Sequence, residues 1–297
     1  MPAVAAADEA DAIARGAYLA RAGGCIACHT DVKGGGAPLA GGGKVETPFG
    51  VFYAPNLTPD PENGLGRWSR ADFVAAMTRG RAPNGGLYYP AFPYPAYSGM
   101  TASDVSDLWT YLQSLAPVDR VDQTHELAFP FNLRAANLGW QFLFYSPQPW
   151  RPDPDRTAEW NRGAYLTEHL LHCGECHTPR NPLGAKRGGM AFAGHKQGTE
   201  NTTVPNITSD QTTGIGDWST GDIVWLLQTG FMPDGDDIQG EMKLLVEHGS
   251  SHLSAEDLNA VGTYILSLPP IENRVREPSA PAETDNGGSD DDYDYDF

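Results

Sequence analysis

The residues best placed for chemistry in this sequence stand in two Cys-x-x-Cys-His patterns, which are Cys25, Cys28 and His29, and Cys173, Cys176 and His177. A CxxC pair can bind zinc, form a redox disulfide or attach haem, and a histidine directly after the second cysteine favours haem. The two thiols add to the two vinyl groups of one haem, and the histidine supplies an axial nitrogen to its iron. The patterns therefore predict two covalently bound haem c groups.

A cysteine and histidine zinc site is the alternative reading of each pattern. Structural zinc takes four protein ligands close together. Each half of the chain offers three candidate ligands in one tight turn and no second cysteine pair, and the two patterns use all four cysteines of the chain. We therefore favour haem and expect no structural disulfide.

The sixth ligand of the second haem is predicted to be a methionine. Met242 lies after a predicted helix end at Gly230 and before the last predicted helix, where a loop can fold back over the haem. A thioether ligand raises the reduction potential relative to a second histidine. Met232 is the second candidate.

The first haem has no methionine at the corresponding position. The residue 150 positions before Met242 is Phe92, whose side chain cannot ligate iron. Met100, just before a predicted helix, is the favoured ligand, whereas Met77 lies inside a predicted helix and is interpreted as a core residue. Ligation by His125 and a five-coordinate iron are the alternatives. An open iron would permit small-ligand binding or peroxide chemistry.

Several sequence blocks occur twice in the same order and at nearly constant spacing. The pairs are RGAYL at 15–19 and 162–166, CIACHT and CGECHT at 25–30 and 173–178, PNLT and PNIT at 55–58 and 205–208, and GLGRWS and GIGDWS at 64–69 and 214–219. Chance similarity does not preserve order and spacing in this way. The chain is therefore predicted to be an internal duplication.

Helix signals accompany the repeats. The predicted starts are Ser69, Thr101, Ser219 and Ser254, each followed three positions later by an aspartate, as in a capping box. Gly80 and Gly230 are predicted helix ends. A further helix is predicted to lead into each CxxCH pattern. Strand-like alternation is scarce, so the predicted class is all-α, with a few helices around a cofactor in each half.

These signals predict four segments. Two tandem domains are expected at residues 8–117 and 159–270, joined by a linker at 118–158 that packs on both. Residues 271–297 are rich in aspartate and poor in aliphatic side chains, and we expect an acidic, disordered tail there. The loops at Pro55-Asn56 and Pro205-Asn206 are expected to lie at the haem edge, where an asparagine could hydrogen-bond a propionate.

Charge restricts the class of partner. The 297 residues carry a formal net charge of −18, so electrostatic binding to nucleic acid or to an anionic membrane surface is not expected, and a basic protein partner fits better. No apolar run of about 18 residues is present, so no transmembrane segment is predicted. The N-terminal MPAVAAADEA resembles the remnant of a removed export signal, which indicates a periplasmic or extracellular protein.

Longer pieces between about residue 15 and residue 268 carry a family resemblance: RGAYLARAGGCIACHT, ETPFGVFYAPNLTPD, GLGRWSRADF, LYYPAFPYPAY, FPFNLR, NRGAYL, HCGECHTPRN, VPNITSD and GIGDWS. With them the sequence resembles the cytochrome c subunits of periplasmic, membrane-associated dehydrogenases of the gluconate and alcohol dehydrogenase type. Members of that family typically carry three haem domains, and many have methionine at the place of Phe92. This chain has two such domains and a phenylalanine.

The resemblance implies two tandem cytochrome-c-like domains that conduct electrons. A periplasmic dehydrogenase would be the donor, and another cytochrome, an oxidase or a quinone-linked complex would be the acceptor. The residues themselves offer no Ser/His/Asp set, paired carboxylates or nucleotide motif for independent catalysis. Two alternatives stay open: a dihaem enzyme of the peroxidase or thiosulfate-oxidising type, and a subunit of an extracellular cytochrome assembly.

Overall fold

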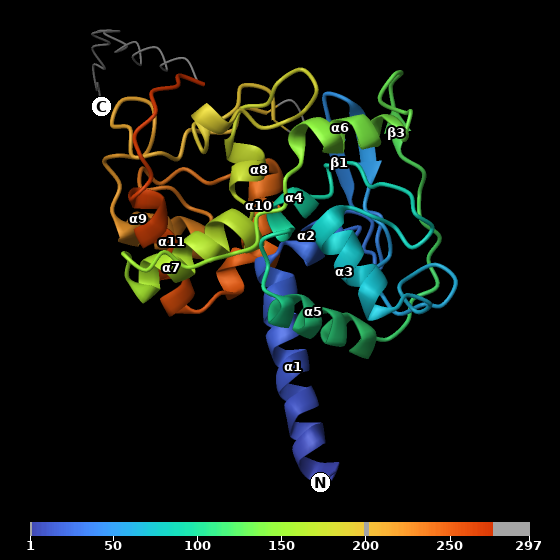
Figure 1. Cartoon of the computed structure of the whole chain (residues 1–297). Helices are drawn as coiled ribbons and strands as arrows, with labels where there is room; N and C mark the ends of the chain where they lie inside the picture. Colours follow the sequence, from blue (N-terminus) through green and yellow to red (C-terminus); the bar gives the residue numbers. More distant parts are fainter. Residues whose placement is uncertain (1, 199–201, 276–297) are drawn as a thin grey trace, which may run out of the picture.

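The computed structural model of this chain describes residues 2–198 and 202–275. It is largely helical, and the first part of α1 projects from the body of the molecule (Figure 1). The helices of the first half are α1 (Pro2–Ala22), α2 (Cys25–Cys28), α3 (Arg70–Arg79), α4 (Tyr94–Tyr97), α5 (Ala102–Ser114) and α6 (Ala136–Phe144). Those of the second half are α7 (Ala158–Tyr165), the π-helix η1 (Leu166–Leu170), α8 (Gly174–His177), the 3-10 helix η2 (Gly188–Met190), α9 (Thr220–Thr229), α10 (Gly240–His248), the 3-10 helix η4 (Ser250–His252) and α11 (Ala255–Leu266).

A small antiparallel sheet departs from the predicted all-α class. It contains β1 (Lys44–Thr47), β2 (Gly50–Tyr53) and β3 (Glu126–Leu127) in the order β1-β2-β3. β1 and β2 form a hairpin, and β3 reaches it from the predicted linker. Strands of two to four residues are too short for an alternating apolar pattern to mark them in the sequence.

The predicted helix starts are confirmed by their capping hydrogen bonds. The side-chain oxygens of Ser69, Thr101, Ser219 and Ser254 each accept a hydrogen bond from the backbone N–H of the aspartate three positions later. At Ser69 and Ser219 the aspartate also accepts from the N-cap N–H, which completes a capping box. Gly80 and Gly230 end α3 and α9 with φ angles of 59° and 80°, which glycine adopts without strain.

Two helix crossings explain why the RGAYL block contains a glycine. α1 packs on α5, and α7 packs on α11. A Cβ atom on Gly16 would lie 2.2 Å from the carbonyl oxygen of Asp107, and one on Gly163 would lie 1.9 Å from that of Ala260. Both distances are far inside van der Waals contact, so each helix pair can approach this closely only at a glycine.

Two tyrosines join the halves of the chain reciprocally. The hydroxyl of Tyr18 donates to Asp257 Oδ2 at 2.5 Å, and the hydroxyl of Tyr165 donates to Asp104. Each hydroxyl also accepts a hydrogen bond, 3.2 Å long, from the N-cap N–H of the same helix. A tyrosine of the first half thus hydrogen-bonds the N-terminus of α11, and a tyrosine of the second half hydrogen-bonds the N-terminus of α5. One core of buried apolar side chains, from Leu19 to Leu268, also spans both halves.

Removing either hydroxyl is expected to destabilise the whole chain. Tyr18→Phe and Tyr165→Phe should each lower the free energy of unfolding by about 1.5–3 kcal/mol, since hydrogen bonds to charged groups contribute about that much. Urea unfolding followed by circular dichroism measures the change. Tyr53→Phe is the matched control, because its hydroxyl bonds the exposed Glu126 instead. Equal losses in all three variants would contradict a specific role of the reciprocal bonds.

The segment between the halves contacts both of them. The N–H of Trp150 donates to the carbonyl oxygen of Gly99 at 3.3 Å, and the indole N–H of Trp140 donates to that of Leu183 at 3.0 Å. Gln141, on α6, donates to the carbonyl oxygen of Arg79. The linker is therefore held against its neighbours on both sides.

The folded part of the chain extends beyond residue 270, the end of the second predicted domain. The side-chain amide of Asn206 donates to the carbonyl oxygen of Ile271 at 2.8 Å, and that of Asn273 donates to Ala193 at 2.8 Å. The expectation of disorder from residue 271 is therefore wrong for these first residues. The rest of the predicted acidic tail, 276–297, lies outside the described residues.

Candidate haem sites

Each CxxCH pattern forms a single helical turn after a longer helix. In the first, α2 follows α1, and the N–H of His29 donates to the carbonyl oxygen of Cys25 at 2.8 Å. In the second, α8 follows α7 and η1, and the N–H of His177 donates to that of Cys173 at 2.9 Å. One turn brings both thiols and the histidine of each pattern to neighbouring positions, as attachment to one cofactor requires.

Each of the two histidines is oriented by a hydrogen bond between its ring and the carbonyl oxygen of a proline. Nδ1 of His29 lies 2.8 Å from the carbonyl oxygen of Pro55, and Nδ1 of His177 lies 2.8 Å from that of Pro205. A carbonyl oxygen only accepts, so each Nδ1 carries the hydrogen and each Nε2 keeps its lone pair. Burial also lowers the pKa of both imidazoles. Both rings are thus neutral at pH 7 and have Nε2 available for a metal.

The four thiols are free and lie within the protein. All four cysteines are partly accessible. Burial nevertheless raises the pKa of Cys25, Cys28 and Cys173 to about 12 and that of Cys176 to about 11. The donor set of each site, two thiols and one neutral imidazole, fits a covalently attached haem.

The loops that carry the prolines are built alike. The side-chain oxygen of Asn56 accepts from the N–H and hydroxyl of Thr58, and Asn206 has the same bonds with Thr208. The amide of Asn206 donates to Thr213 and to Ile271. Both hydrogens of that amide are therefore used, and the predicted bond to a propionate is not supported at Asn206.

The two CxxCH turns lie close together, which the sequence did not indicate. The hydroxyl of Tyr97 donates to the carbonyl oxygen of Gly23 at 2.8 Å, two residues before Cys25. The ring of Tyr97 packs edge-on against His172, directly before Cys173, with ring centroids 5.4 Å apart. Burial is the main cause of the raised pKa of Cys28, and the negative charges of Glu241 and of a Cys176 thiolate raise this pKa further. Only the tertiary packing of the halves produces this contact.

Met242 lies on α10, next to the first CxxCH turn. α10 packs against α2 and α9, and a Cβ on Gly24 would touch the side chain of Leu245. Met242 is partly buried and packs against the core. Glu241 contributes to the raised pKa of Cys176 as well as Cys28, so the start of α10 lies between the two turns. Met242 as the sixth ligand of the second haem stays a prediction.

Met100 and its alternatives lie in different surroundings. Met100 is 6% exposed and directly precedes the N-cap Thr101, as Leu253 directly precedes the N-cap Ser254. It thus occupies a position that a core leucine fills in the other half. Met77 is buried in α3, in agreement with its interpretation as a core residue.

Phe92 and His125, also in the first half, lie in aromatic clusters. Phe92 packs against Tyr88, Tyr94 and Tyr97. Nδ1 of His125 accepts a hydrogen bond from the N–H of Tyr53 at 3.3 Å. His125 therefore has one nitrogen engaged in the small sheet, and Met100 stays our predicted ligand of the first haem.

A buried carboxylate in the second CxxCH turn was missed by the sequence analysis. Glu175, 9% exposed, accepts hydrogen bonds from Arg180 at 2.7 Å and Lys186 at 2.8 Å. Burial alone would raise its pKa, but the two cations lower it below the usual value. The glutamate is thus ionised beside the second site. No local signal in the sequence marks this pairing, since the partners lie five and eleven residues away.

Two further features are absent from the described part of the chain. No group of three or more His, Cys, Asp and Glu side chains in residues 2–198 and 202–275 is arranged to hold a metal ion. In the same ranges, no helix has the length and apolar character needed to cross a membrane.

Comparison with known proteins gives consistent matches. The cytochrome c family model matches residues 13–116. A dihaem c-type cytochrome of Cereibacter sphaeroides is 42% identical over 87% of this chain and 86% of its own length. A nicotinate dehydrogenase subunit of Pseudomonas putida is 39% identical, over 86% of this chain and 21% of its length. The fructose dehydrogenase cytochrome subunit of Gluconobacter japonicus is 38% identical over 86% of this chain and 52% of its own length. The chain thus spans about half or less of these two dehydrogenase subunits.

Proposed function

This chain belongs to the cytochrome c family, in the group that includes the cytochrome c subunits of fructose, gluconate and alcohol dehydrogenases, and we propose that it relays electrons from a periplasmic dehydrogenase to a downstream acceptor. The acceptor would be another cytochrome, an oxidase or a quinone-linked complex. The observation that carries the proposal is the pair of CxxCH turns, each with its histidine held by a prolyl carbonyl at 2.8 Å.

We propose that each turn holds one haem c, in two domains that arose by internal duplication. Cys25, Cys28, Cys173 and Cys176 would attach the two haems, and His29, His177, Met100 and Met242 would ligate the irons. The matched bonds of the histidines, the Pro-Asn loops and the tyrosines that join the halves support the duplication. The proposed domains are residues 8–117 and 159–270, with 118–158 between them.

When bound, haem supplies a one-electron Fe(III)/Fe(II) couple. The chain's own residues set its surroundings. The prolyl carbonyls fix the tautomer of each histidine and increase the basicity of Nε2. The contact of Tyr97 with Gly23 and His172 keeps the two CxxCH turns adjacent. This adjacency would keep the electron path between the sites short, which an electron relay requires.

The haem content tests the first part of the proposal. The chain, matured in a host that attaches haem c, is expected to contain two covalent haems in a pyridine haemochrome assay. The double variant Cys25→Ala with Cys28→Ala should retain only the second haem. The double variant Cys173→Ala with Cys176→Ala should retain only the first haem. A content of one haem in the unchanged chain would contradict the proposal.

Reduction by a dehydrogenase tests the second part. The oxidised cytochrome is mixed with the catalytic subunits of alcohol, gluconate, fructose or nicotinate dehydrogenases that lack their own cytochrome. Reduction of both haems after addition of the matching substrate would support the relay. Persistent oxidation with every donor, despite complete reduction by dithionite, would argue against a dehydrogenase donor.

A further inference from the structure

The second half contains one residue more than the first between the RGAYL block and the CxxCH pattern. In the first half, Leu19 stands six positions before Cys25. In the second half, Leu166 stands seven positions before Cys173. The π-helix η1 accommodates the extra residue, because the N–H of Leu171 donates to the carbonyl oxygen of Leu166, five positions earlier, at 2.7 Å. Single π turns inside helices are frequent at functional sites.

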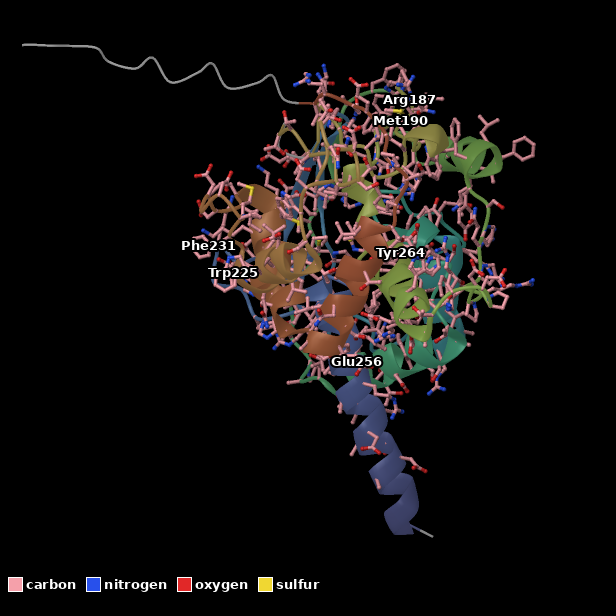
Figure 2. The ribbon with its side chains drawn as sticks, turned by 90° about the vertical axis from the view of Figure 1, so that its left-hand side faces the viewer. Arg187, Met190, Trp225, Phe231, Glu256 and Tyr264 are labelled. Carbon is pink, nitrogen blue, oxygen red and sulfur yellow. The ribbon has the colours of Figure 1, made fainter. Side chains whose placement is uncertain are left out.

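The residues of η1 are bonded to both halves of the chain. The hydroxyl of Tyr264, on α11 (Figure 2), donates to the carboxylate of Glu168. Nδ1 of His169 lies 3.0 Å from the carbonyl oxygen of Ala96 in α4. The π turn is therefore fixed between the second half, which contains it, and α4 of the first half.

His172 adopts a left-handed backbone conformation at a place where the first half has a glycine. His172 and Gly24 directly precede the first cysteine of their CxxCH patterns. Their φ angles are 43° and 66°. Glycine adopts such angles without strain, whereas a residue with a side chain does so at a cost in free energy. Strain of this kind persists where surrounding contacts hold the residue in place.

The contacts of the His172 side chain are with the first CxxCH turn and with Tyr97 beside it. The imidazole packs edge-on against the ring of Tyr97, with ring centroids 5.4 Å apart. The hydroxyl of the same tyrosine donates to the carbonyl oxygen of Gly23 at 2.8 Å. A Cβ on Gly24 would lie 3.9 Å from Nε2 of His172. Burial lowers the pKa of His172, so a neutral ring fills this contact at pH 7.

We propose that His172 is a positioning residue that, together with the extra residue of η1, sets the distance and the angle between the two CxxCH turns. Its side chain reaches the first turn from the second, and Gly24, at the equivalent place, has no side chain for the reverse contact. Because each turn is proposed to attach one haem, His172 also sets how strongly the two haems couple. The inference thus rests on the proposed function, which places a haem on each turn.

Circular dichroism in the Soret region tests the proposal on the full chain with haem attached. Two haems that are close together and fixed in angle couple, and they give a band with two lobes of opposite sign. We expect this band in the unchanged chain. His172→Gly should lose most of it, because no ring then holds the second turn against the first. This variant should still fold and attach both haems, since glycine adopts the positive φ angle without strain.

His172→Phe is the conservative variant. It keeps an aromatic ring against Tyr97 and should therefore retain the two-lobed band. The folded state should nevertheless be less stable than in the unchanged chain, because phenylalanine accepts a positive φ angle less readily than histidine. Urea unfolding measures this loss separately from the Soret band.

His252→Ala is the matched control, because this histidine of η4 is exposed. It should leave the Soret band unchanged. Absence of a two-lobed band from the unchanged chain, an unchanged band in His172→Gly, or an equal loss in His252→Ala would overturn the proposal. Haem content, measured on the same samples, separates these outcomes from a failure of the two proposed haems. No dehydrogenase takes part, so a failure of the proposed relay would leave the Soret result intact.

Discussion

Met242→Ala is expected to remove methionine ligation from the second haem. The methionine-to-iron charge-transfer band should lose one of its two contributions, and the reduction potential of that haem should fall by on the order of 0.1 V or more, within the roughly 0.8 V that axial ligands span. A thioether favours the reduced iron, so its loss stabilises the oxidised form. Near-infrared spectroscopy and a potentiometric titration measure the two effects. Met232→Ala is the control and should leave both unchanged; loss of the band in this control would reassign the ligand.

The same measurement on Met100→Leu tests the first haem. Since Leu253 fills the matching place before α11, a leucine at 100 should conserve the packing. We expect the band of the first haem to disappear while the melting temperature stays nearly constant. An unchanged spectrum would exclude Met100 and leave the iron with His125 or with an open position. Added peroxide or cyanide would then distinguish these two states.

Gly163→Ala is expected to have a large effect on stability. The added methyl group would lie 1.9 Å from the carbonyl oxygen of Ala260, so α7 and α11 must separate. We expect a loss of about 3 kcal/mol or more in the free energy of unfolding, the upper range for overpacking. Urea unfolding of the haem-loaded chain measures it. Because α7 and η1 lead directly into Cys173, incomplete attachment of the second haem is the expected companion effect.

Gly139→Ala is the matched control for this prediction. Gly139 also lies in a helix, α6, and a Cβ there would meet no atom within 4 Å. Alanine should therefore stabilise the chain slightly, by about 0.5–1 kcal/mol, through its better helix propensity. A similar loss at both glycines would show that the close approach of α7 to α11 is not what Gly163 permits.

The sequence by itself determined the features that depend on neighbouring residues. The two CxxCH turns, the capping residues Ser69 and Ser219, and the end of α3 at Gly80 all follow from local hydrogen bonds and backbone conformation. Such interactions reach only three or four residues along the chain. They were therefore visible as fixed spacings, and the repeat made each of them visible twice.

Only the tertiary structure decided which distant surfaces meet. The contact of Tyr97 with Gly23 and His172, which makes the CxxCH turns adjacent, joins residues more than 70 positions apart. The third strand of the sheet, β3, comes from the linker. The orientation of α6 depends on hydrogen bonds from Gln141 to residues of the first half. Local patterns specify the helices and turns, whereas the way in which these pack depends on contacts that have no signature in sequence spacing.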